Sequence, residues 1–305
     1  VIPQDIPIPV GIPFGFFPKA NRRASGILFP TFGEDATRGF FMRDFGYYIG
    51  LNEYWDMTLR SSLYSRGSYD LSMAARYQKR YKFDGNLNLR YSSTRTGIEG
   101  SPGYKPFKAF NIQWSHTQRP EANPGTTFTA SVNAGTSSYF SNTAAGGTYN
   151  FDQLTRNTLS SNISYGKTFG NGLFNFTSSL SHRQDMQQKT VFLELPTFSL
   201  NMSTISPFDS KSRTGDQKWY QRINVGYSLR GTNTLDTKEN LLFKSGALKN
   251  LRNGFQHTVP ISFSQNLLKF FNLNTGVNYT ENWYTKTIRK QWSPAENKVL
   301  TDTVP

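Results

Sequence analysis

Alternation between apolar and polar residues is the feature that most constrains the fold of this chain. In residues 83–92 the odd positions are Phe, Gly, Leu, Leu and Tyr, and the even positions are Asp, Asn, Asn, Arg and Ser. Residues 222–230 and 271–280 repeat the alternation, with Asn, Ser and Gly at most of the polar positions. Because successive side chains of a β-strand point to opposite faces, a period of two predicts strands with one apolar and one polar face.

The pattern predicts an all-β fold with about thirteen strands, several of them ten residues or longer. Soluble strands usually have about five or six residues, whereas a tilted strand needs about 9–11 residues to cross a bilayer. A transmembrane antiparallel β-barrel is therefore favoured, and the alternative is a soluble β-sandwich with shorter strands and more frequent turns. The predicted strands lie near residues 24–32, 39–51, 55–65, 69–81, 83–93, 107–118, 127–137, 157–169, 174–184, 189–205, 219–230, 256–265 and 271–285.

The connections between these predicted strands also alternate in length. Short turns such as Gly170-Asn171-Gly172 fall at one end of the strands, and longer loops such as 94–106 and 138–156 fall at the other. Two short connections, at 66–68 and 185–188, interrupt this trend. Outer-membrane barrels have short periplasmic turns and long external loops, so the pattern also predicts an orientation in the membrane.

Composition excludes several other classes of protein. No stretch approaches the roughly 20 apolar residues of a transmembrane helix. The chain has no Cys and only three His, so we expect no disulfide scaffold, no metal site and no cofactor. No motif indicates catalysis, because there is no G-x-S-x-G turn and the glycine pairs lack the strand–turn–helix setting of a phosphate loop. The sequence therefore gives no support for an enzyme.

The excess of basic residues is the main clue to a ligand. The formal net charge is +14, but the basic residues lie among alternating strands rather than on a helix of a nucleic-acid-binding type. We therefore expect no nucleic-acid partner. An anionic amphiphile such as a phosphorylated glycolipid, held by ion pairs with its phosphates, is one interpretation. Solvated turns and a polar lumen are the alternative for any single basic residue.

The first thirty residues differ from the rest, because they hold six of the fifteen prolines. Residues 6–18 (IPIPVGIPFGFFP) are uncharged and apolar, yet proline prevents a helix and most ladder bonds. This composition predicts an extended, buried connector that enters the barrel, or the last edge of a preceding domain. A disordered linker would be more polar. We expect the chain to be part of a longer protein.

Several sequence blocks are similar to the LptD family of lipopolysaccharide-assembly outer-membrane proteins, in the form found in Bacteroidetes. They are PIPVGIPFGFFPKANRRASGILFPTFGE, RGFFMRDFGYYIGLNEYWDMTLRSSLYSRGSYDLSMAARYQKRYKFDGNLNLRYS, QRPEANPGTTFTASVNAGTSSY and SPFDSKSRTGDQKWYQRINVGYSL. The resemblance implies a barrel of roughly 26 strands in the outer membrane of a Gram-negative bacterium. Residues 21–305 would be its N-terminal half, and residues 1–20 a proline-rich connector from an upstream periplasmic jelly-roll domain.

The resemblance also implies ligands and partners. They are lipopolysaccharide, a lipoprotein plug of the LptE type, a periplasmic lipopolysaccharide-bridge protein and the lipids of the outer membrane. Lipopolysaccharide would leave through a lateral gate between the first and last strands, formed here by Pro30, Ile27 and Phe29. The passage for acyl chains would be lined by Pro7, Pro9, Pro13, Phe14, Phe16, Phe17 and Pro18. Phosphates would meet Arg22, Arg23, Arg76 and Lys79.

Two departures from the family pattern bear on this expectation. The chain lacks the cysteines that better-known members use, and residues 40–51 lack the proline that those members carry in the second strand. The gate would therefore depend more heavily on Pro30, which without the resemblance indicates only a strand end or a bulge. The functional alternatives are a passive porin-like or secretion-type barrel and a surface adhesin. A porin would need no apolar proline-rich entry segment.

Overall fold

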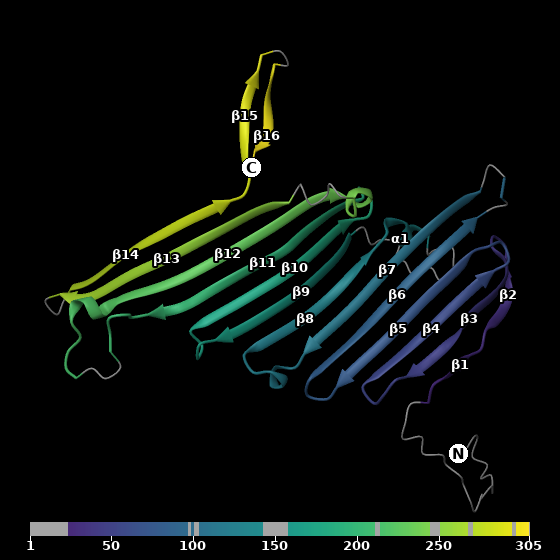
Figure 1. Ribbon diagram of the computed structural model, residues 1–305, viewed down its shortest axis with the longest axis horizontal. Helices are drawn as coiled ribbons and strands as arrows, with labels where there is room; N and C mark the ends of the chain where they lie inside the picture. Colours follow the sequence, from purple (N-terminus) through teal and green to yellow (C-terminus); the bar gives the residue numbers. More distant parts are fainter. Residues whose placement is uncertain are drawn as a thin grey trace, which may run out of the picture.

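The computed structural model shows one broad antiparallel sheet (Figure 1). It describes residues 24–96, 99–100, 104–142, 158–210, 214–244, 251–267, 271–294 and 297–304. The first eight strands are β1 (Gly26–Leu28), β2 (Thr31–Asp35), β3 (Gly39–Gly50), β4 (Trp55–Tyr64), β5 (Tyr69–Lys79), β6 (Phe83–Thr96), β7 (Lys105–Gln118) and β8 (Thr126–Gly135). They are followed by β9 (Thr158–Phe169), β10 (Phe174–Asp185), β11 (Thr190–Ile205), β12 (Ile223–Lys238), β13 (Arg252–Leu267), β14 (Phe271–Tyr284), β15 (Thr287–Ser293) and β16 (Lys298–Val304).

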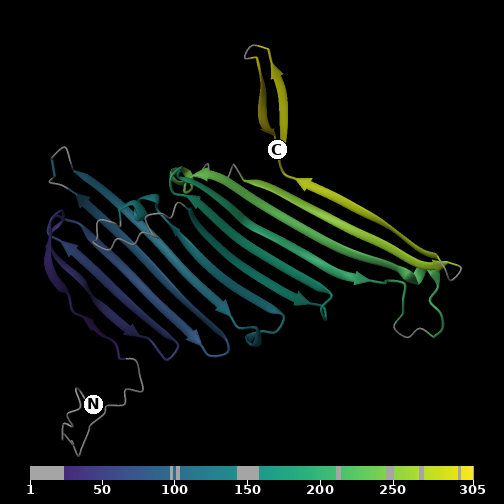
Figure 2. The same cartoon turned by 180° about the vertical axis from the view of Figure 1, so that it is seen from behind.

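Neighbours in the sheet follow the order of the chain. Strands β1 and β2 both pair with β3, and each later strand up to β14 pairs with the one before it (Figures 1 and 2). Strands β15 and β16 form a separate hairpin. The prediction of an all-β, antiparallel fold is confirmed, and the sheet is consistent with part of a barrel. Within the described residues the sheet is not closed, because no pairing joins β14 to β1.

The cross-strand register gives the sheet one apolar and one polar face. Directly paired residues share a face, so the pairings can be followed from β5 through to β14. The apolar face holds Leu87, Leu89, Tyr91, Val225, Tyr227, Val277 and Tyr279, and the polar face holds Asn86, Asn88, Asn224 and Asn278. The alternation in the sequence therefore predicted correctly which residues lie together.

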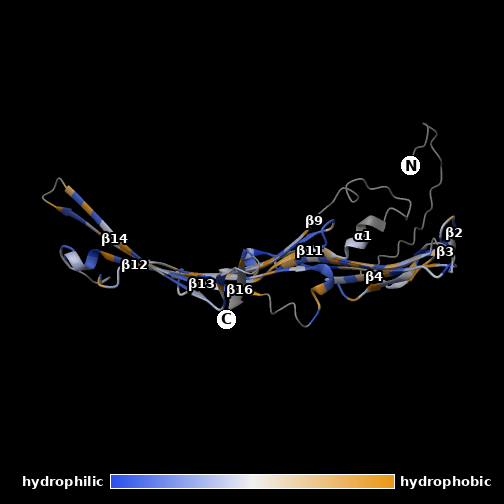
Figure 3. Cartoon of the chain, turned by 90° about the horizontal axis from the view of Figure 1, so that it is seen from above, coloured by the Kyte–Doolittle hydropathy of each residue, from blue (hydrophilic) through white to orange (hydrophobic). Residues whose placement is uncertain are grey.

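This sheet is a single layer with almost no core. Seen from above, no second sheet packs on the described strands (Figure 3). Large apolar side chains remain uncovered on the apolar face: Val277 is 68% exposed and Tyr279 55% exposed. Soluble proteins rarely leave a whole sheet face of apolar side chains exposed, whereas lipid covers the outer face of a membrane barrel. The architecture therefore favours the barrel over the soluble sandwich.

An aromatic cluster lies on the apolar face, at the end where the short turns join the strands. Its members are Trp55, Tyr77, Phe83, Trp114, His116 and Phe128. The ring centroids of Trp55 and Tyr77 are 4.5 Å apart. The Tyr77 hydroxyl accepts a hydrogen bond from Trp114 Nε1 at 2.8 Å and lies 2.8 Å from His116 Nδ1. Aromatic side chains with polar tips gather in this way at membrane–water interfaces.

Most described turns are short, and the helices are few. Gly170, Asn171 and Gly172 all have positive φ, as the predicted turn between β9 and β10 requires. Helix α1 (Ser137–Asn142) begins at the last residue of the predicted strand 127–137 and continues into the predicted loop 138–156. The 3-10 turns are η1 (Pro120–Ala122), η3 (Trp219–Arg222) and η4 (Glu239–Leu241). Among the described helices, none is both long and apolar enough to cross a membrane.

Two of the predicted strands differ markedly from those in the structure. The strand expected at 24–32 is divided into β1 and β2. The strand expected at 219–230 begins at Ile223, after η3, and continues to Lys238, so the expected loop 231–255 is much shorter. The reason is tertiary: residues 234–238 pair with residues 190–194 of the long strand β11. The hairpin of β15 and β16 was not predicted.

Candidate functional site at the first strands

The first strand of the sheet is interrupted at Phe29 and Pro30. Before the interruption, Leu28 pairs with Gly46 of β3, and after it Thr31 pairs with Arg43. Proline has no backbone N–H and cannot donate a hydrogen bond to a neighbouring strand. Residues 24–32 therefore form two short segments on one partner instead of one continuous strand.

A β-bulge in β3 lies at the same level. The flanking pairs of β3 with β4 are Met42 with Leu63 and Phe45 with Ser61, so β3 has one residue more than β4 across this step. Asp44 adopts the left-handed conformation, with φ 59°, and its backbone N–H donates to Ser62 Oγ at 3.3 Å instead of to the ladder. The first strand and β3 are thus both irregular at one level, next to the continuous strand β4.

The outer edge of β1 and β2 has no strand partner in the described part of the chain. Ile27 pairs with Tyr47, on the apolar face of the sheet, and its side chain is 68% exposed. Phe29 is 84% exposed. At the beginning of β1, Ser25 Oγ accepts a hydrogen bond from the N–H of Gly50 at 2.9 Å, which extends the attachment to β3. The three predicted gate residues therefore lie together at an open sheet edge.

The predicted phosphate contacts are not brought together. Arg76 and Lys79 of β5 differ by three positions, so their side chains have opposite parity along the strand. Arg76 lies 3.4 Å from a carboxylate oxygen of Asp56, and the Lys79 Nζ lies 5.3 Å from the ring centroid of Tyr54. Arg22, Arg23 and the predicted lipid-passage residues of the connector 1–20 lie outside the described residues.

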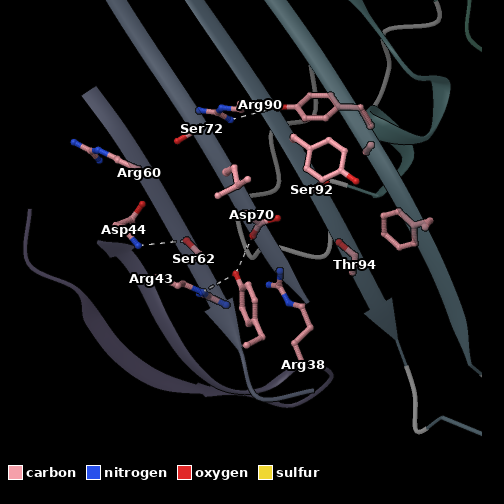
Figure 4. Close-up of a pocket in the computed structure, with 16 residues that line it drawn as sticks. Arg38, Arg43, Asp44, Arg60, Ser62, Asp70, Ser72, Arg90, Ser92 and Thr94 are labelled. Atoms are coloured by element: carbon pink, nitrogen blue, oxygen red, sulfur yellow. Dashed lines mark hydrogen bonds between the residues drawn. The ribbon is translucent and has the colours of Figure 1, made fainter. Parts of the chain in front are cut away.

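A cavity of about 430 Å³ opens on the polar face beside this region (Figure 4). Its lining includes four arginines: Arg38, Arg43, Arg60 and Arg90. Asp35 forms ion pairs with two of these arginines: its Oδ2 lies 2.9 Å from Arg38 Nη2 and 3.0 Å from Arg43 Nη2. Two cations held by one carboxylate leave the cavity with an excess of positive charge near the first strands.

A chain of hydrogen bonds continues from these ion pairs across β4 and β5. Arg43 Nε donates to the Tyr64 hydroxyl at 3.1 Å, and that hydroxyl donates to Asp70 Oδ2 at 3.2 Å (Figure 4). The guanidinium of Arg38 also lies 4.2 Å from the centroid of the Tyr64 ring. These contacts fix the wall of the cavity next to the interrupted strands.

Sequence reasoning missed this arginine cluster. Its members come from β3, β4, β6 and the turn before β3, and they meet only because the register places them side by side. The signal that was available is parity: Arg60 and Arg90 occupy polar positions in alternating segments. Asp44 was missed too, because nothing in its immediate sequence indicates a positive φ.

Comparison with known proteins identifies the family to which the chain belongs. No curated protein matches the chain. The family model described as LptD protein matches residues 2–305, which is nearly the whole chain. Proteins of this family are located in the outer membrane of Gram-negative bacteria and take part in lipopolysaccharide transport and assembly. The chain belongs to the LptD family.

Proposed function

We propose that this chain forms the gate side of a translocon that inserts lipopolysaccharide into the outer leaflet of the outer membrane. The observation that carries the proposal is the interruption at Pro30 beside the bulge at Asp44, at an edge without a strand partner in the described residues. Each ladder bond that is missing lowers the cost of parting two strands by about 0.5–1.5 kcal/mol in water. A first strand that is held to β3 by an interrupted ladder is therefore suited to move when the barrel opens sideways.

In this proposal the two faces of the sheet have different tasks. Ile27 and Phe29, both exposed, would meet acyl chains and membrane lipid, while the polar face would meet sugars and phosphates. The apolar connector 1–20 would guide the acyl chains from an upstream jelly-roll domain, with Arg22, Arg23, Arg76 and Lys79 as weaker phosphate contacts. A lipoprotein plug of the LptE type and a periplasmic bridge protein would complete the system, whose task is transport and not catalysis.

Photo-crosslinking in cells tests this proposal. A photoreactive residue replaces either Ile27 of β1 or Val277 of β14 in the full-length protein. Both side chains are 68% exposed and both lie on the apolar face, so they form a matched pair. We expect Ile27 to crosslink to newly made lipopolysaccharide, and the crosslink to fade when supply from the inner membrane is stopped. Val277 should crosslink only to resident lipid, at a level that does not follow the supply.

The opposite result would show that the gate does not lie at this edge of the sheet. If crosslinking at Ile27 does not follow the supply of lipopolysaccharide, the lateral-gate proposal fails and a passive porin-like barrel becomes the better interpretation. Crosslinks that follow the supply equally at both positions would show that the passage is not confined to the first strand.

A further inference from the structure

Two arginines flank one serine in the wall of the polar cavity. Ser72 of β5 is the direct cross-strand partner of Arg60 in β4 and of Arg90 in β6. Directly paired residues share a face, and neighbouring strands lie about 4.7–4.9 Å apart. The Cα atoms of the two arginines are therefore separated by about twice that spacing, with the serine hydroxyl between them (Figure 4).

These two arginines differ from the other two in the cavity. The guanidinium of Arg60 forms neither an ion pair nor a side-chain hydrogen bond within the described residues, and Arg60 is exposed. Arg90 is also exposed, and its guanidinium donates to an uncharged partner, the hydroxyl of Tyr139 in α1, at 3.4 Å. Arg38 and Arg43, in contrast, share the carboxylate of Asp35. Most guanidinium N–H groups of the two arginines beside Ser72 are therefore available to donate hydrogen bonds to a ligand.

The acidic groups nearby leave this preference in place. Asp44 and Asp70 line the same cavity, but neither forms an ion pair with Arg60 or Arg90, although Asp70 lies close enough to Arg90 to attract it electrostatically. Asp70 accepts a hydrogen bond from the Tyr64 hydroxyl. Two guanidinium groups with a hydroxyl between them match an anion that carries several oxygens, because each arginine can donate two parallel hydrogen bonds to a phosphate.

We propose that Arg60, Ser72 and Arg90 form a binding site for a phosphate group of a glycolipid headgroup. The proposal rests on the proposed function, and it adds a place on the barrel wall where the headgroup is held beside the first strands. The two arginines bind the phosphate oxygens, and the Ser72 hydroxyl donates to an oxygen between them. The cavity volume of about 430 Å³ lies within the range of about 300–1,000 Å³ that small-molecule sites occupy.

Arg230 of β12 offers a matched control. It is exposed, lies on the same polar face, and pairs directly with Ser199 and Gln256, so it has a serine neighbour but no second arginine across that serine. Removing its charge changes the net charge of the polar face without touching the proposed site. A difference between the two sites therefore reports the arrangement of the arginines and not the total charge.

The test uses the full-length protein with its partners in detergent. The probes are a diphosphorylated lipid A disaccharide, the same glycolipid without phosphates, and inorganic phosphate. We expect the Arg60→Gln/Arg90→Gln variant to bind the phosphorylated glycolipid at least about tenfold more weakly, because two charge-assisted pairs are lost. The Arg230→Gln variant should bind within about twofold of the wild type, since an exposed charge that has no partner in the described part of the chain contributes little. Binding of the dephosphorylated glycolipid should be weak and equal in all proteins.

Ser72→Asp is a second variant, which keeps both arginines and places a carboxylate between them. We expect it to lose the phosphorylated glycolipid to a similar extent, so the test holds even if the double variant fails to fold. Equal affinity of the wild type and either variant for the phosphorylated glycolipid would overturn the site. Inorganic phosphate that binds as tightly as the glycolipid would overturn its assignment to a headgroup. Failure of the wild type to bind lipopolysaccharide at all would instead count against the proposed function.

Discussion

Pro30 in the first strand and Asp44 in β3 lie at the same level of the sheet, between the pair Leu28–Gly46 and the pair Thr31–Arg43. The two pairs are three residues apart in the first strand and three residues apart in β3. The extra residue of the bulge in β3 is therefore matched by a residue of the interrupted first strand. Strand β4 takes one residue fewer across the bulge. A proline and a left-handed aspartate therefore act together on the pairing of the outermost strands.

This correspondence predicts an unusual result for deletions. Removing Asp44 alone should bring β3 into register with β4 but leave Pro30 as an unmatched residue in the first strand. Removing Pro30 alone leaves the bulge of β3 opposite a shortened partner. Removing both residues should restore a continuous ladder between the first strand and β3. The double deletion should therefore be more stable than either single deletion. The temperature at which the folded barrel unfolds, followed by detergent gel electrophoresis, measures this stability.

The double deletion should then be defective in transport although it is well folded. Sensitivity of cells to large hydrophobic antibiotics reports the lipopolysaccharide barrier, and barrel abundance provides the control. Effects of the two deletions that simply add would show that Pro30 and Asp44 act independently.

Gly46 should be intolerant of a side chain, because a Cβ there would collide with the backbone carbonyl oxygen of Leu59. We expect Gly46→Ala to lower the free energy of unfolding by about 1–3 kcal/mol, since the backbone of β4 must move. Gly26→Ala is the control, as a Cβ at Gly26 meets no atom within 4 Å. Urea unfolding in lipid vesicles measures both variants, and equal stability of the two would contradict the close approach of β3 and β4.

The Tyr77 hydroxyl should stabilise the aromatic cluster at the short-turn end of the sheet. Tyr77→Phe removes the acceptor of the Trp114 indole N–H and the contact with His116 Nδ1, both at 2.8 Å. Because Tyr77 is only 7% exposed, we expect a loss of about 1–3 kcal/mol from a polar group left unpaired. Tyr165→Phe, on the same face, has no such partner among the described residues and should change the stability little. Tryptophan fluorescence during urea unfolding distinguishes these outcomes.

Local patterns predicted the faces of the sheet, and long-range pairing determined the rest. The positions of Leu87 and Asn86 on opposite faces follow from alternation, which is a property of the strand alone. The Gly170-Asn171-Gly172 turn follows from residues that tolerate positive φ. The bulge at Asp44 does not, since it depends on the lengths of the strands on either side.

The same limit applies to the candidate site. Pro30 could be singled out because proline has one physical consequence in a strand wherever it occurs. The row of Arg60, Ser72 and Arg90 could not, because three strands must be paired in one register before these residues meet. Arg76 and Lys79 show the converse: they are close in sequence, but their side chains have opposite parity along β5.

A reversible lock on the first strand tests the lateral gate most directly. One cysteine replaces Ile27, and a second replaces the facing residue in the last strand of the complete barrel. Cysteines at Met73 and Leu89, which pair directly in β5 and β6 on the apolar face, form a control lock that leaves the first strand free. We predict that oxidation of the first pair stops lipopolysaccharide export, that a reductant restores it, and that the control lock has no effect. Export at the normal rate with the first strand locked would contradict the account.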